Sequence, residues 1–244
     1  MSFLVRVFNG DTIEEAKVED SVVTTQSGRR MAVADARFST PTAPSKIICV
    51  GFNYRDHAKE LGRELPREPL FFLKPPSALL AHGEIIVYPP ETKQLEFECE
   101  LAAVIGRRCR NVPVEDARSV ILGYSIFNDV TARDIQKVET QWVRAKCFDT
   151  FAPYGPVVAT HVDPSDLRLM TRVNGIVKQD SSTRHLAFDV YALAAMASRI
   201  MTLEPGDIIA TGTPAGVGQL QPGDEVSIEI EGIGVLTNRV AAEE

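Results

Sequence analysis

Seven residues near the middle of the chain, Leu95-Glu-Phe-Glu-Cys-Glu-Leu101, alternate between apolar and acidic side chains. Because successive side chains of a β-strand point to opposite faces, the alternation predicts a strand with Glu96, Glu98 and Glu100 on one face. Three carboxylates along one strand repel each other, and the segment contains no basic residue. The acidic face is therefore either in contact with water, as on an edge strand, or neutralised by a cation. Ligands that are all oxygen favour Mg²⁺, Ca²⁺ or Mn²⁺ over zinc.

The rest of the chain also predicts more strands than helices. Strands are expected over residues 3–8, 16–25, 47–50, 70–73, 95–105, 123–130, 208–210, 225–230 and 235–240, and a hairpin over 167–179. Helices are expected over about 113–121 and 189–203, and a brief helix is expected between an N-cap at Asn53 and a C-terminal Gly62. Strands that connect mostly through hairpins favour a β-dominated α+β fold over a regularly alternating α/β fold.

Composition limits the domain organisation and the class of partner. The proline-containing segment 39–45 separates a small N-terminal β region, residues 1–43, from a main domain, residues 44–244. The 26 basic and 33 acidic residues give a net charge of -7, so we expect no general attraction for nucleic acid or anionic membranes. No apolar stretch approaches the roughly 20 residues that cross a bilayer, and no signal peptide is expected. Four cysteines without a C-x-x-C pair predict free thiols in a cytoplasmic protein.

Two further groups of residues could act together with the acidic strand. Asp129 lies at the end of the expected strand 123–130, where it could provide a third carboxylate to a metal site. His57 and Glu60 stand three residues apart and share one face of the brief helix. A histidine oriented by a carboxylate is typical of water activation, although a pair with this spacing is also common as a simple surface contact.

A glycine-rich loop and two lysines point to an anionic ligand. Thr211–Gly218 follows an expected strand but lacks the Gly-Lys-Ser/Thr ending of a Walker A loop. Its backbone N–H groups could hold a carboxylate, or the segment could be only a tight turn. Lys74 and Lys146 each lie beside apolar residues, where a single lysine usually extends its charge to solvent. Two such lysines together with three carboxylates favour an anionic substrate.

Six motifs, read in order, resemble the fumarylacetoacetate hydrolase family. They are GFNYRDHAKE at 51–60, FLKP at 72–75, EFECEL at 96–101, NDVTARD at 128–134, QWVRAKCFDTFAPYGP at 141–156 and LEPGDIIATGTPAGVG at 203–218. The resemblance extends from about residue 46 to the C-terminus. It implies a mixed β-sheet roll, usually found as a homodimer, and it matches the first 43 residues, the small N-terminal β appendage, only weakly.

The resemblance also implies a metal site and a pair of residues that activate water. A divalent ion, Mg²⁺ or Mn²⁺, would be held by Glu98, Glu100 and Asp129, whereas Glu96 does not match a ligand position. His57 and Glu60 would activate water on a segment that becomes ordered over the substrate.

The remaining implied roles concern the substrate. Lys146 would stabilise a developing enolate, and Thr213 would contact the substrate carboxylate. Weaker candidates for substrate binding are Arg133, Gln136 and Lys74. Residues 61–69, which no motif matches, are expected to select the substrate.

The short single-copy members of the family imply several reactions. They include acylpyruvases, oxaloacetate decarboxylases and isomerases or decarboxylases of homoprotocatechuate breakdown. We expect cleavage of a carbon–carbon bond, by hydrolysis or decarboxylation, in a small 2-oxo or 2,4-dioxo acid through a metal-stabilised enolate. The alternative is an isomerase or decarboxylase of the 2-hydroxyhepta-2,4-diene-1,7-dioate type in aromatic catabolism. A different class, a non-catalytic metal-dependent acid-binding module, would not need the His57–Glu60 pair.

Overall fold

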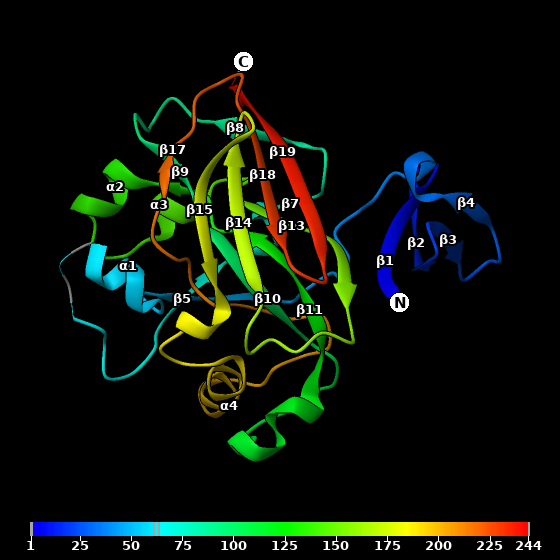
Figure 1. Cartoon of the computed structure of the whole chain (residues 1–244), viewed down its shortest axis with the longest axis horizontal. Helices are drawn as coiled ribbons and strands as arrows, with labels where there is room; N and C mark the ends of the chain where they lie inside the picture. The colour runs from blue at the N-terminus through cyan, green and yellow to red at the C-terminus, as the bar shows by residue number, and fades with distance from the viewer. Residues whose placement is uncertain (1, 61, 63, 244) are drawn as a thin grey trace.

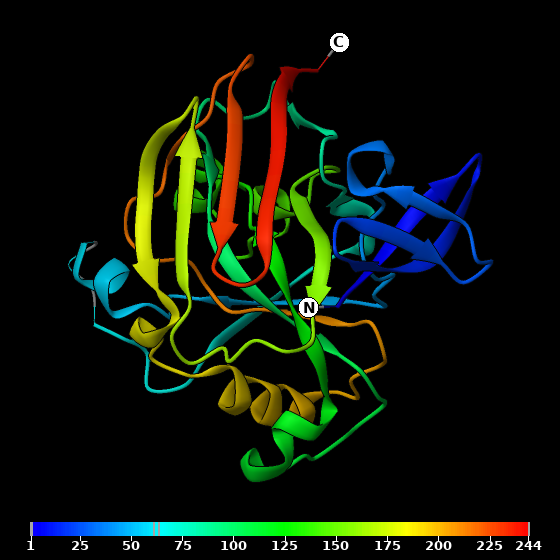
Figure 2. The same ribbon diagram turned by 45° about the vertical axis from the view of Figure 1, so that its right-hand side comes forward.

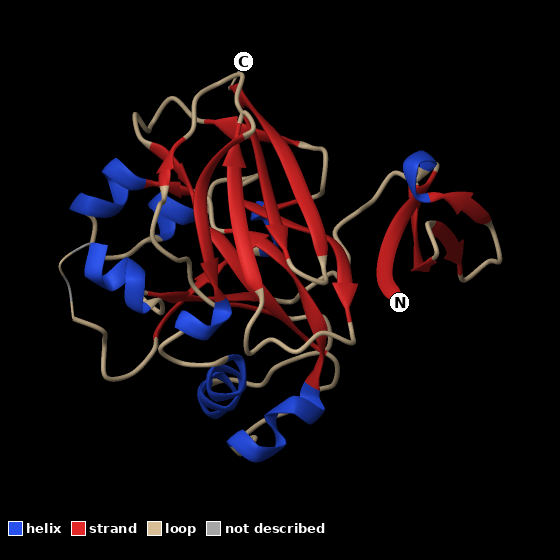
Figure 3. Cartoon of the chain, in the orientation of Figure 1, coloured by secondary structure: helices blue, strands red, loops and turns tan. Residues whose placement is uncertain are grey.

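The structure, a computed structural model, describes residues 2–60, 62 and 64–243. Three β-sheets form most of the molecule, and short helices lie around their edges (Figures 1 and 3). The predicted β-dominated α+β fold is confirmed. The two larger sheets are mixed, because most of their strand pairs are antiparallel but β16 pairs with β5, β13 with β7 and β19 with β8 in parallel.

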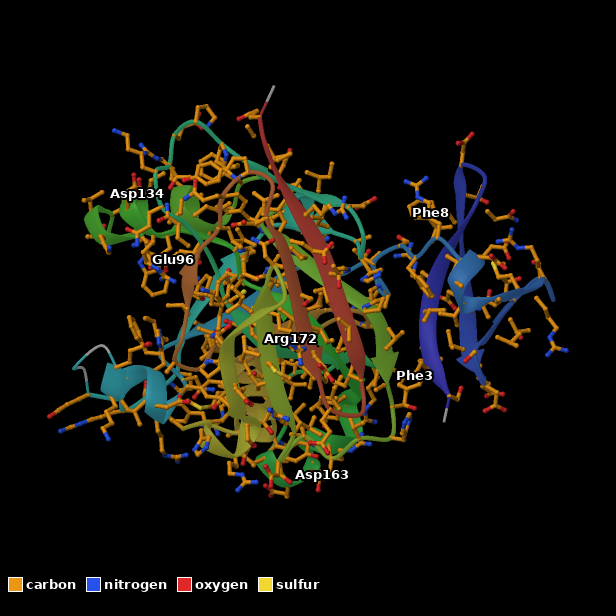
Figure 4. All side chains as sticks on the ribbon, turned by 45° about the horizontal axis from the view of Figure 1, so that its top comes forward. Phe3, Phe8, Glu96, Asp134, Asp163 and Arg172 are labelled. Atoms are coloured by element: carbon orange, nitrogen blue, oxygen red, sulfur yellow. The ribbon has the colours of Figure 1, made fainter. Side chains whose placement is uncertain are left out.

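The largest sheet contains eleven strands in the order β4-β3-β2-β1-β13-β11-β10-β16-β5-β6, with β7 pairing separately with β13. Its strands are β1 (Phe3–Asn9), β2 (Thr12–Glu19), β3 (Val22–Thr25), β4 (Arg30–Ala32), β5 (Ile47–Gly51), β6 (Leu70–Lys74), β7 (Leu79–Leu80), β10 (Cys99–Ile105), β11 (Ile121–Asn128), β13 (Ala152–Ala159) and β16 (Ile208–Ala210). Its first four strands lie apart from the other elements, at the right of Figure 1, and join the sheet where Phe3 pairs with Ala159. Figure 4 shows Phe3 and Phe8 on β1 in this N-terminal part.

Two smaller sheets complete the fold. Five strands run in the order β15-β14-β18-β19-β8, and three run in the order β12-β9-β17. Their bounds are β8 (Ile85–Tyr88), β14 (Arg168–Val173), β15 (Ile176–Ser182), β18 (Glu225–Ile230), β19 (Gly234–Ala242), β9 (Leu95–Phe97), β12 (Thr131–Ala132) and β17 (Gly218–Gln219). The five-stranded sheet packs in front of the large one, with β19 in contact with β13 and β18 in contact with β11 (Figure 2).

The helices are short, and α4 follows a local signal in the sequence. They are α1 (Arg55–Glu60), α2 (Arg133–Val138), α3 (Val143–Lys146) and α4 (Val190–Ile200). The Asp189 carboxylate caps α4 by accepting a hydrogen bond from Ala192 N at 2.8 Å. Within the described residues, no helix has the length and apolar character needed to cross a membrane.

Both faces of β10 pack against the core, which explains why every residue after its first two is apolar. Leu101, Ala103 and Ile105 belong to the core cluster that also contains residues of α4, whereas Ala102 and Val104 belong to a second cluster with Tyr154. Both faces of the strand are therefore buried, as expected for a central strand covered on two sides. This packing holds the start of β10, where the acidic residues lie, in a fixed position.

Several predicted elements differ from the structure in detail. The single strand expected over 95–105 is divided into β9 and β10 at Glu98, and the strand expected over 16–25 is β2 and β3, because Asp20 and Ser21 form a turn with positive φ. The helix expected over 113–121 is a 3₁₀ helix over Val114–Val120. The sequence patterns did not predict β13, α2 or α3.

Asn53 does not cap α1. Its side chain donates hydrogen bonds to the carbonyl oxygens of Thr211 at 2.8 Å and Phe188 at 3.0 Å, and it accepts one from Phe188 N at 2.8 Å. This buried amide therefore joins the segment before α1 to the glycine-rich loop. Long-range partners such as these cannot be read from a local capping pattern.

Candidate active site

A buried acidic triad lies where β9, β10 and β11 meet. Glu98, Glu100 and Asp129 are almost completely buried, and each offers a carboxylate oxygen within 4.8 Å of the others. The β10–β11 ladder pairs Cys99 with Asn128, so Glu98 and Asp129 follow directly beyond its end. Glu98 N donates to the Asn128 side chain at 3.0 Å, and Asp129 N donates to Glu98 O at 2.9 Å. These backbone contacts hold the carboxylates together despite their repulsion.

Two buried lysines neutralise part of this charge. Lys146 Nζ lies 2.5 Å from Asp129 Oδ2 and 3.0 Å from Glu98 Oε2, and Lys74 Nζ lies 2.5 Å from Asp129 Oδ1. Burial raises the pKa of Glu98, but the Lys146 ammonium and the Arg133 guanidinium outweigh this and lower the pKa to about 2. Burial also lowers the pKa of Lys146, but the Asp129 and Glu98 carboxylates outweigh it and raise the pKa. Glu98 and Lys146 therefore form a charged pair.

Glu100 differs from the other two carboxylates because, among the described residues, it forms no ion pair. Its Oε2 accepts one hydrogen bond, from Gly212 N at 2.9 Å. Burial raises the pKa of Glu100 well above its usual value, and the nearby Asp129 and Glu98 carboxylates raise it further. A cation bound here would supply the missing positive charge. A set of three buried carboxylate ligands fits a hard divalent ion such as Mg²⁺ or Mn²⁺.

Glu96, the third member of the predicted acidic face, lies outside the triad. Its carboxylate pairs with Arg133 Nε at 2.6 Å, and Arg133 also contacts Glu98 and Gln136 through its other nitrogens. Figure 4 shows Glu96 beside α2, on the same side as Asp134. The division of the strand at Glu98 separates Glu96 from Glu100, so the three glutamates do not form one continuous face.

His57 and Glu60 lie together on α1 as the spacing predicted. His57 Nδ1 is 3.0 Å from Glu60 Oε2, and Glu60 Oε1 accepts a hydrogen bond from Gly216 N at 3.1 Å. The carboxylate therefore connects the histidine to the glycine-rich loop that follows β16. The His57 ring is buried, whereas the Glu60 side chain is 41% exposed.

A cleft about 450 Å³ in volume opens beside His57, and Phe52, Gln94, Arg133 and Trp142 contribute to its walls. A smaller pocket leads inward from it, since both share His57, Arg133, Gln136 and Trp142. Seven predicted site residues line this inner pocket: His57, Glu98, Glu100, Arg133, Gln136, Lys146 and Thr213. The pocket therefore brings the His57 ring together with two carboxylates of the triad and the Lys146 ammonium group.

Three predicted site residues lie elsewhere. Asp129 belongs to the triad but is covered by the two lysines. Lys74 does not line the cleft: its side chain is fully buried, and its Nζ contacts Asp129 and the Val130 carbonyl, so it supports a carboxylate instead of facing a substrate. Glu60 reaches the pocket only through His57. Of the stretch expected to select the substrate, Leu61 and Arg63 lie outside the described residues.

The fumarylacetoacetate hydrolase C-terminal domain model matches residues 46–241. The chain belongs to the fumarylacetoacetate hydrolase family. An uncharacterized protein of Methanocaldococcus jannaschii is 54% identical over 82% of this chain and 85% of its own length. A mitochondrial oxaloacetate tautomerase of Bos taurus is 40% identical over 93% of this chain and 78% of its own length.

Solved structures of family members share the fold over the whole chain. A 5-carboxymethyl-2-hydroxymuconate delta-isomerase from Mycobacterium smegmatis is 44% identical, with a TM-score of 0.93 and 99% of both chains covered. A maleylpyruvate hydrolase from a Sphingobium species, in complex with manganese(II) and pyruvate, is 31% identical, with a TM-score of 0.84 and 99% and 100% coverage. Enzymes with this fold thus include isomerases, a tautomerase and a hydrolase.

Sequence reasoning missed residues that shape the site without a charge. Trp142 packs edge-on against Phe72 and Phe52, at ring-centroid distances of 5.2 and 6.2 Å, and forms one wall of the cleft. Gln179, on the predicted hairpin, reaches the glycine-rich loop. Gln179 is the single fully buried residue of β15, but its burial follows from contacts distant in the sequence, so no local pattern signals it.

Proposed function

We propose that this family member is a divalent-metal-dependent enzyme that cleaves a carbon–carbon bond in a 2-oxo or 2,4-dioxo acid. The observation that carries the proposal is the inner pocket, where His57, paired with Glu60, faces the same space as Glu98, Glu100 and Lys146. Binding of an acid alone requires the cations but not a histidine held by a carboxylate. Support also comes from the relative that binds manganese and pyruvate.

Each group of residues has a specific task in this reaction. Glu98, Glu100 and Asp129 would hold Mg²⁺ or Mn²⁺, which when bound acts as a Lewis acid on the 2-oxo group. The Thr213 hydroxyl and the Arg133 and Gln136 side chains would orient the substrate. The His57 imidazole, oriented by Glu60, would take a proton from water as the water attacks the distal carbonyl carbon.

The Lys146 ammonium would stabilise the negative charge that develops on the substrate. Breaking the bond between C3 and the attacked carbon leaves its electron pair on the 2-oxo fragment as an enolate. Lys146 is buried, and the Asp129 and Glu98 carboxylates keep it protonated, so its positive charge is fixed before the reaction begins. Such a preorganised charge stabilises a transition state more than a mobile solvated one.

A second candidate, proton transfer without bond cleavage, is favoured by the names of two relatives. One relative is an oxaloacetate tautomerase, and one solved structure is an isomerase of a hydroxymuconate. In this reaction the His57–Glu60 pair would move a proton between the oxygen on C2 and a carbon, C3 in enol-oxaloacetate or C5 in a 2-hydroxy-2,4-dienoate, instead of activating water. The same enolate and the same ammonium group would serve both reactions.

A panel of substrates separates the candidates. The purified protein is incubated with Mg²⁺ or Mn²⁺ and acetylpyruvate, oxaloacetate, enol-oxaloacetate or 2-hydroxyhepta-2,4-diene-1,7-dioate. We expect cleavage of acetylpyruvate or loss of CO₂ from oxaloacetate above the rate of the metal alone, which is the necessary control. Turnover of only enol-oxaloacetate or the dienedioate would support the second candidate. Metal binding without any turnover would contradict both and favour the acid-binding module.

A further inference from the structure

The buried amide of Gln179 lies directly behind Thr213. Gln179 is on β15 opposite Thr171 of β14, and its side chain crosses to the glycine-rich loop. Its Nε2 donates to Thr213 Oγ1 at 2.8 Å and to the Pro214 carbonyl at 2.9 Å. Its Oε1 accepts from Cys99 N at 3.2 Å and from Thr171 Oγ1 at 2.8 Å. Gln179 and Thr171 are at most 1% exposed.

Two backbone groups determine the orientation of this amide. The Cys99 N–H can only donate a hydrogen bond, so the atom facing it must be the Gln179 oxygen. The Pro214 carbonyl can only accept, so the atom facing it must be the Gln179 nitrogen. A flipped amide would place nitrogen against the Cys99 N–H and oxygen against the Pro214 carbonyl, and both of these buried hydrogen bonds would be lost.

The orientation of Gln179 determines the role of the Thr213 hydroxyl. Thr213 Oγ1 must accept from Gln179 Nε2, so its hydrogen points away from Gln179. Among the described residues, Gln179 is the only hydrogen-bond partner of the Thr213 side chain, which lines the inner pocket beside Glu100 and Lys146. The hydroxyl hydrogen is therefore available to a bound molecule.

We propose that Gln179 is a positioning residue that fixes the Thr213 hydroxyl as a hydrogen-bond donor to an anionic oxygen of the ligand. The proposal rests on the proposed function, because it supposes that a carboxylate enters the inner pocket. Without the Nε2 donor of Gln179, the Thr213 hydroxyl could turn its hydrogen toward residue 179 and present lone pairs to the pocket. The hydrogen bond from Gln179 Nε2 excludes that orientation before a ligand arrives. The site therefore favours a ligand that places a hydrogen-bond acceptor, and not a donor, next to the Thr213 hydroxyl.

The loop geometry supports a fixed Thr213. A Cβ atom built on Gly216 would lie 2.3 Å from the Lys178 carbonyl oxygen, which shows how closely the loop packs on β15. Gly212, on the other side of Thr213, has φ +94° and packs against Asn53 and the Val50 carbonyl. The backbone on both sides of Thr213 is thus held, and the hydroxyl torsion is the remaining freedom that Gln179 controls.

The test exchanges the donor of Gln179 for an acceptor. In Gln179→Glu the carboxylate can still accept from Cys99 N, but its second oxygen accepts from the Thr213 hydroxyl, which then presents lone pairs to the pocket. Oxalate binding to the Mn²⁺-loaded protein, measured by calorimetry, should weaken about 10- to 100-fold, the usual effect of losing a hydrogen bond to a charged group. Oxamate, whose amide can donate, should weaken less than oxalate. General disruption of the pocket would weaken both ligands equally.

A double-mutant cycle links the effect to Thr213. Thr213→Val should weaken oxalate binding by a similar factor, whereas Thr213→Ser, which keeps the hydroxyl, should retain most of the wild-type affinity for oxalate. Adding Gln179→Glu to Thr213→Val should change oxalate affinity by less than about twofold, since neighbouring residues that act through one contact are not additive. Gln179→Met, which carries no charge, serves as a second variant if the glutamate prevents folding. Gln179→Met should weaken the binding of oxalate and oxamate, and this effect should also nearly disappear when it is combined with Thr213→Val.

The outcomes distinguish this proposal from the proposed function. Independent, additive effects of the Gln179 and Thr213 substitutions, or equal losses for oxalate and oxamate in Gln179→Glu, would overturn the role of Gln179 even if the enzyme turns over its substrates. Failure of the wild-type protein to bind oxalate would also overturn it. Strong oxalate binding with the expected coupling, but no turnover of any substrate, would support Gln179 and reject the proposed reaction.

Discussion

The floor of the candidate active site and its rim are built in opposite ways. The floor, formed by Glu98, Glu100 and Asp129 with the two lysines, is buried between strands, and its charged groups contact each other directly. The rim is α1, which lies against the glycine-rich loop and contacts it through the hydrogen bond from Gly216 N to Glu60 at 3.1 Å. A rigid floor suits a bound ion, whereas a six-residue helix whose Glu60 side chain is partly exposed can move to admit a substrate.

The floor and the rim also differ in whether a carboxylate that loses one partner has another. Lys74 and Lys146 already neutralise Asp129 and Glu98, so the floor has an internal substitute for part of the metal charge. Glu60 has no such reserve. Its partners are His57 and a backbone amide, and its side chain is partly exposed to water. We therefore expect the floor to tolerate loss of metal structurally and the rim to respond strongly to small changes.

Metal removal has the largest expected effect on activity and a small one on folding. Treatment with EDTA should abolish turnover, and Mg²⁺ or Mn²⁺ should restore it, because three ligands converge on one position. The circular dichroism spectrum should stay unchanged, since the lysines keep the carboxylates paired. Added metal should raise the melting temperature, as expected for a ligand that binds only the folded state. Full activity of the verified metal-free protein would contradict the metal site.

Glu100→Gln is the variant that removes a ligand with the least structural cost. The amide oxygen can still accept the hydrogen bond from Gly212 N, and no lysine loses a partner. Mn²⁺ affinity should fall about 100-fold or more in a calorimetric titration. Glu96→Gln is the matched control, because Glu96 comes from the same acidic segment but lies outside the triad. Equal Mn²⁺ affinities for the two variants would place the ion elsewhere.

The acidic floor was largely predictable from the sequence, and the reason is local. Alternation of Glu96, Glu98 and Glu100 indicates a strand, and Asp129 follows directly after another apolar run. The family resemblance then separated Glu96 from the ligands. The structure adds what local patterns do not contain: the division of the strand at Glu98 and the pairing of Lys74 with Asp129. Both depend on residues more than 25 positions away.

The rim was predictable only in part. The spacing of His57 and Glu60 correctly placed them on one helical face, but it did not reveal the contact with Gly216 or the role of Asn53 as a link to Thr211. Trp142 and Gln179 were missed for the same reason. They carry no charge, and their importance comes from neighbours brought close by the fold.

Substitutions in the His57–Glu60 pair should have the next largest effect on activity and leave the floor intact. His57→Ala removes the proton acceptor, so kcat for hydrolysis of an acylpyruvate should fall about 10²–10⁴-fold. Glu60→Gln should produce a similar loss if the carboxylate orients the imidazole, because the amide cannot stabilise a protonated ring. Mn²⁺ affinity should stay within about twofold of wild type for both variants, since neither residue belongs to the triad. Near-wild-type hydrolysis by His57→Ala would refute water activation by this residue.

Comparison of two reactions sharpens the result. Decarboxylation has no attacking water. If the wild-type protein decarboxylates oxaloacetate, the His57→Ala protein should therefore retain much more of its rate on oxaloacetate than on an acylpyruvate. A parallel loss of both rates with unchanged metal content would instead show that His57 acts in a step common to both. Proton transfer to or from the enolate is such a step.

The smallest expected effect is a change in the mobility of α1, and it tests the contrast between rim and floor directly. Backbone amides of residues 55–60 should exchange with deuterium several-fold more slowly after addition of Mg²⁺ and oxalate, whereas those of β10 should change little because they are already buried in the sheet. Gly216→Ala should weaken this response, because its Cβ would lie 2.3 Å from the Lys178 carbonyl and displace the loop that holds Glu60. Gly223→Ala is the matched control, since Gly223 has a similar φ, +97° against +94°, but no atom near its Cβ position. If α1 exchanges slowly without ligand and no faster in Gly216→Ala than in Gly223→Ala, the rim is as rigid as the floor.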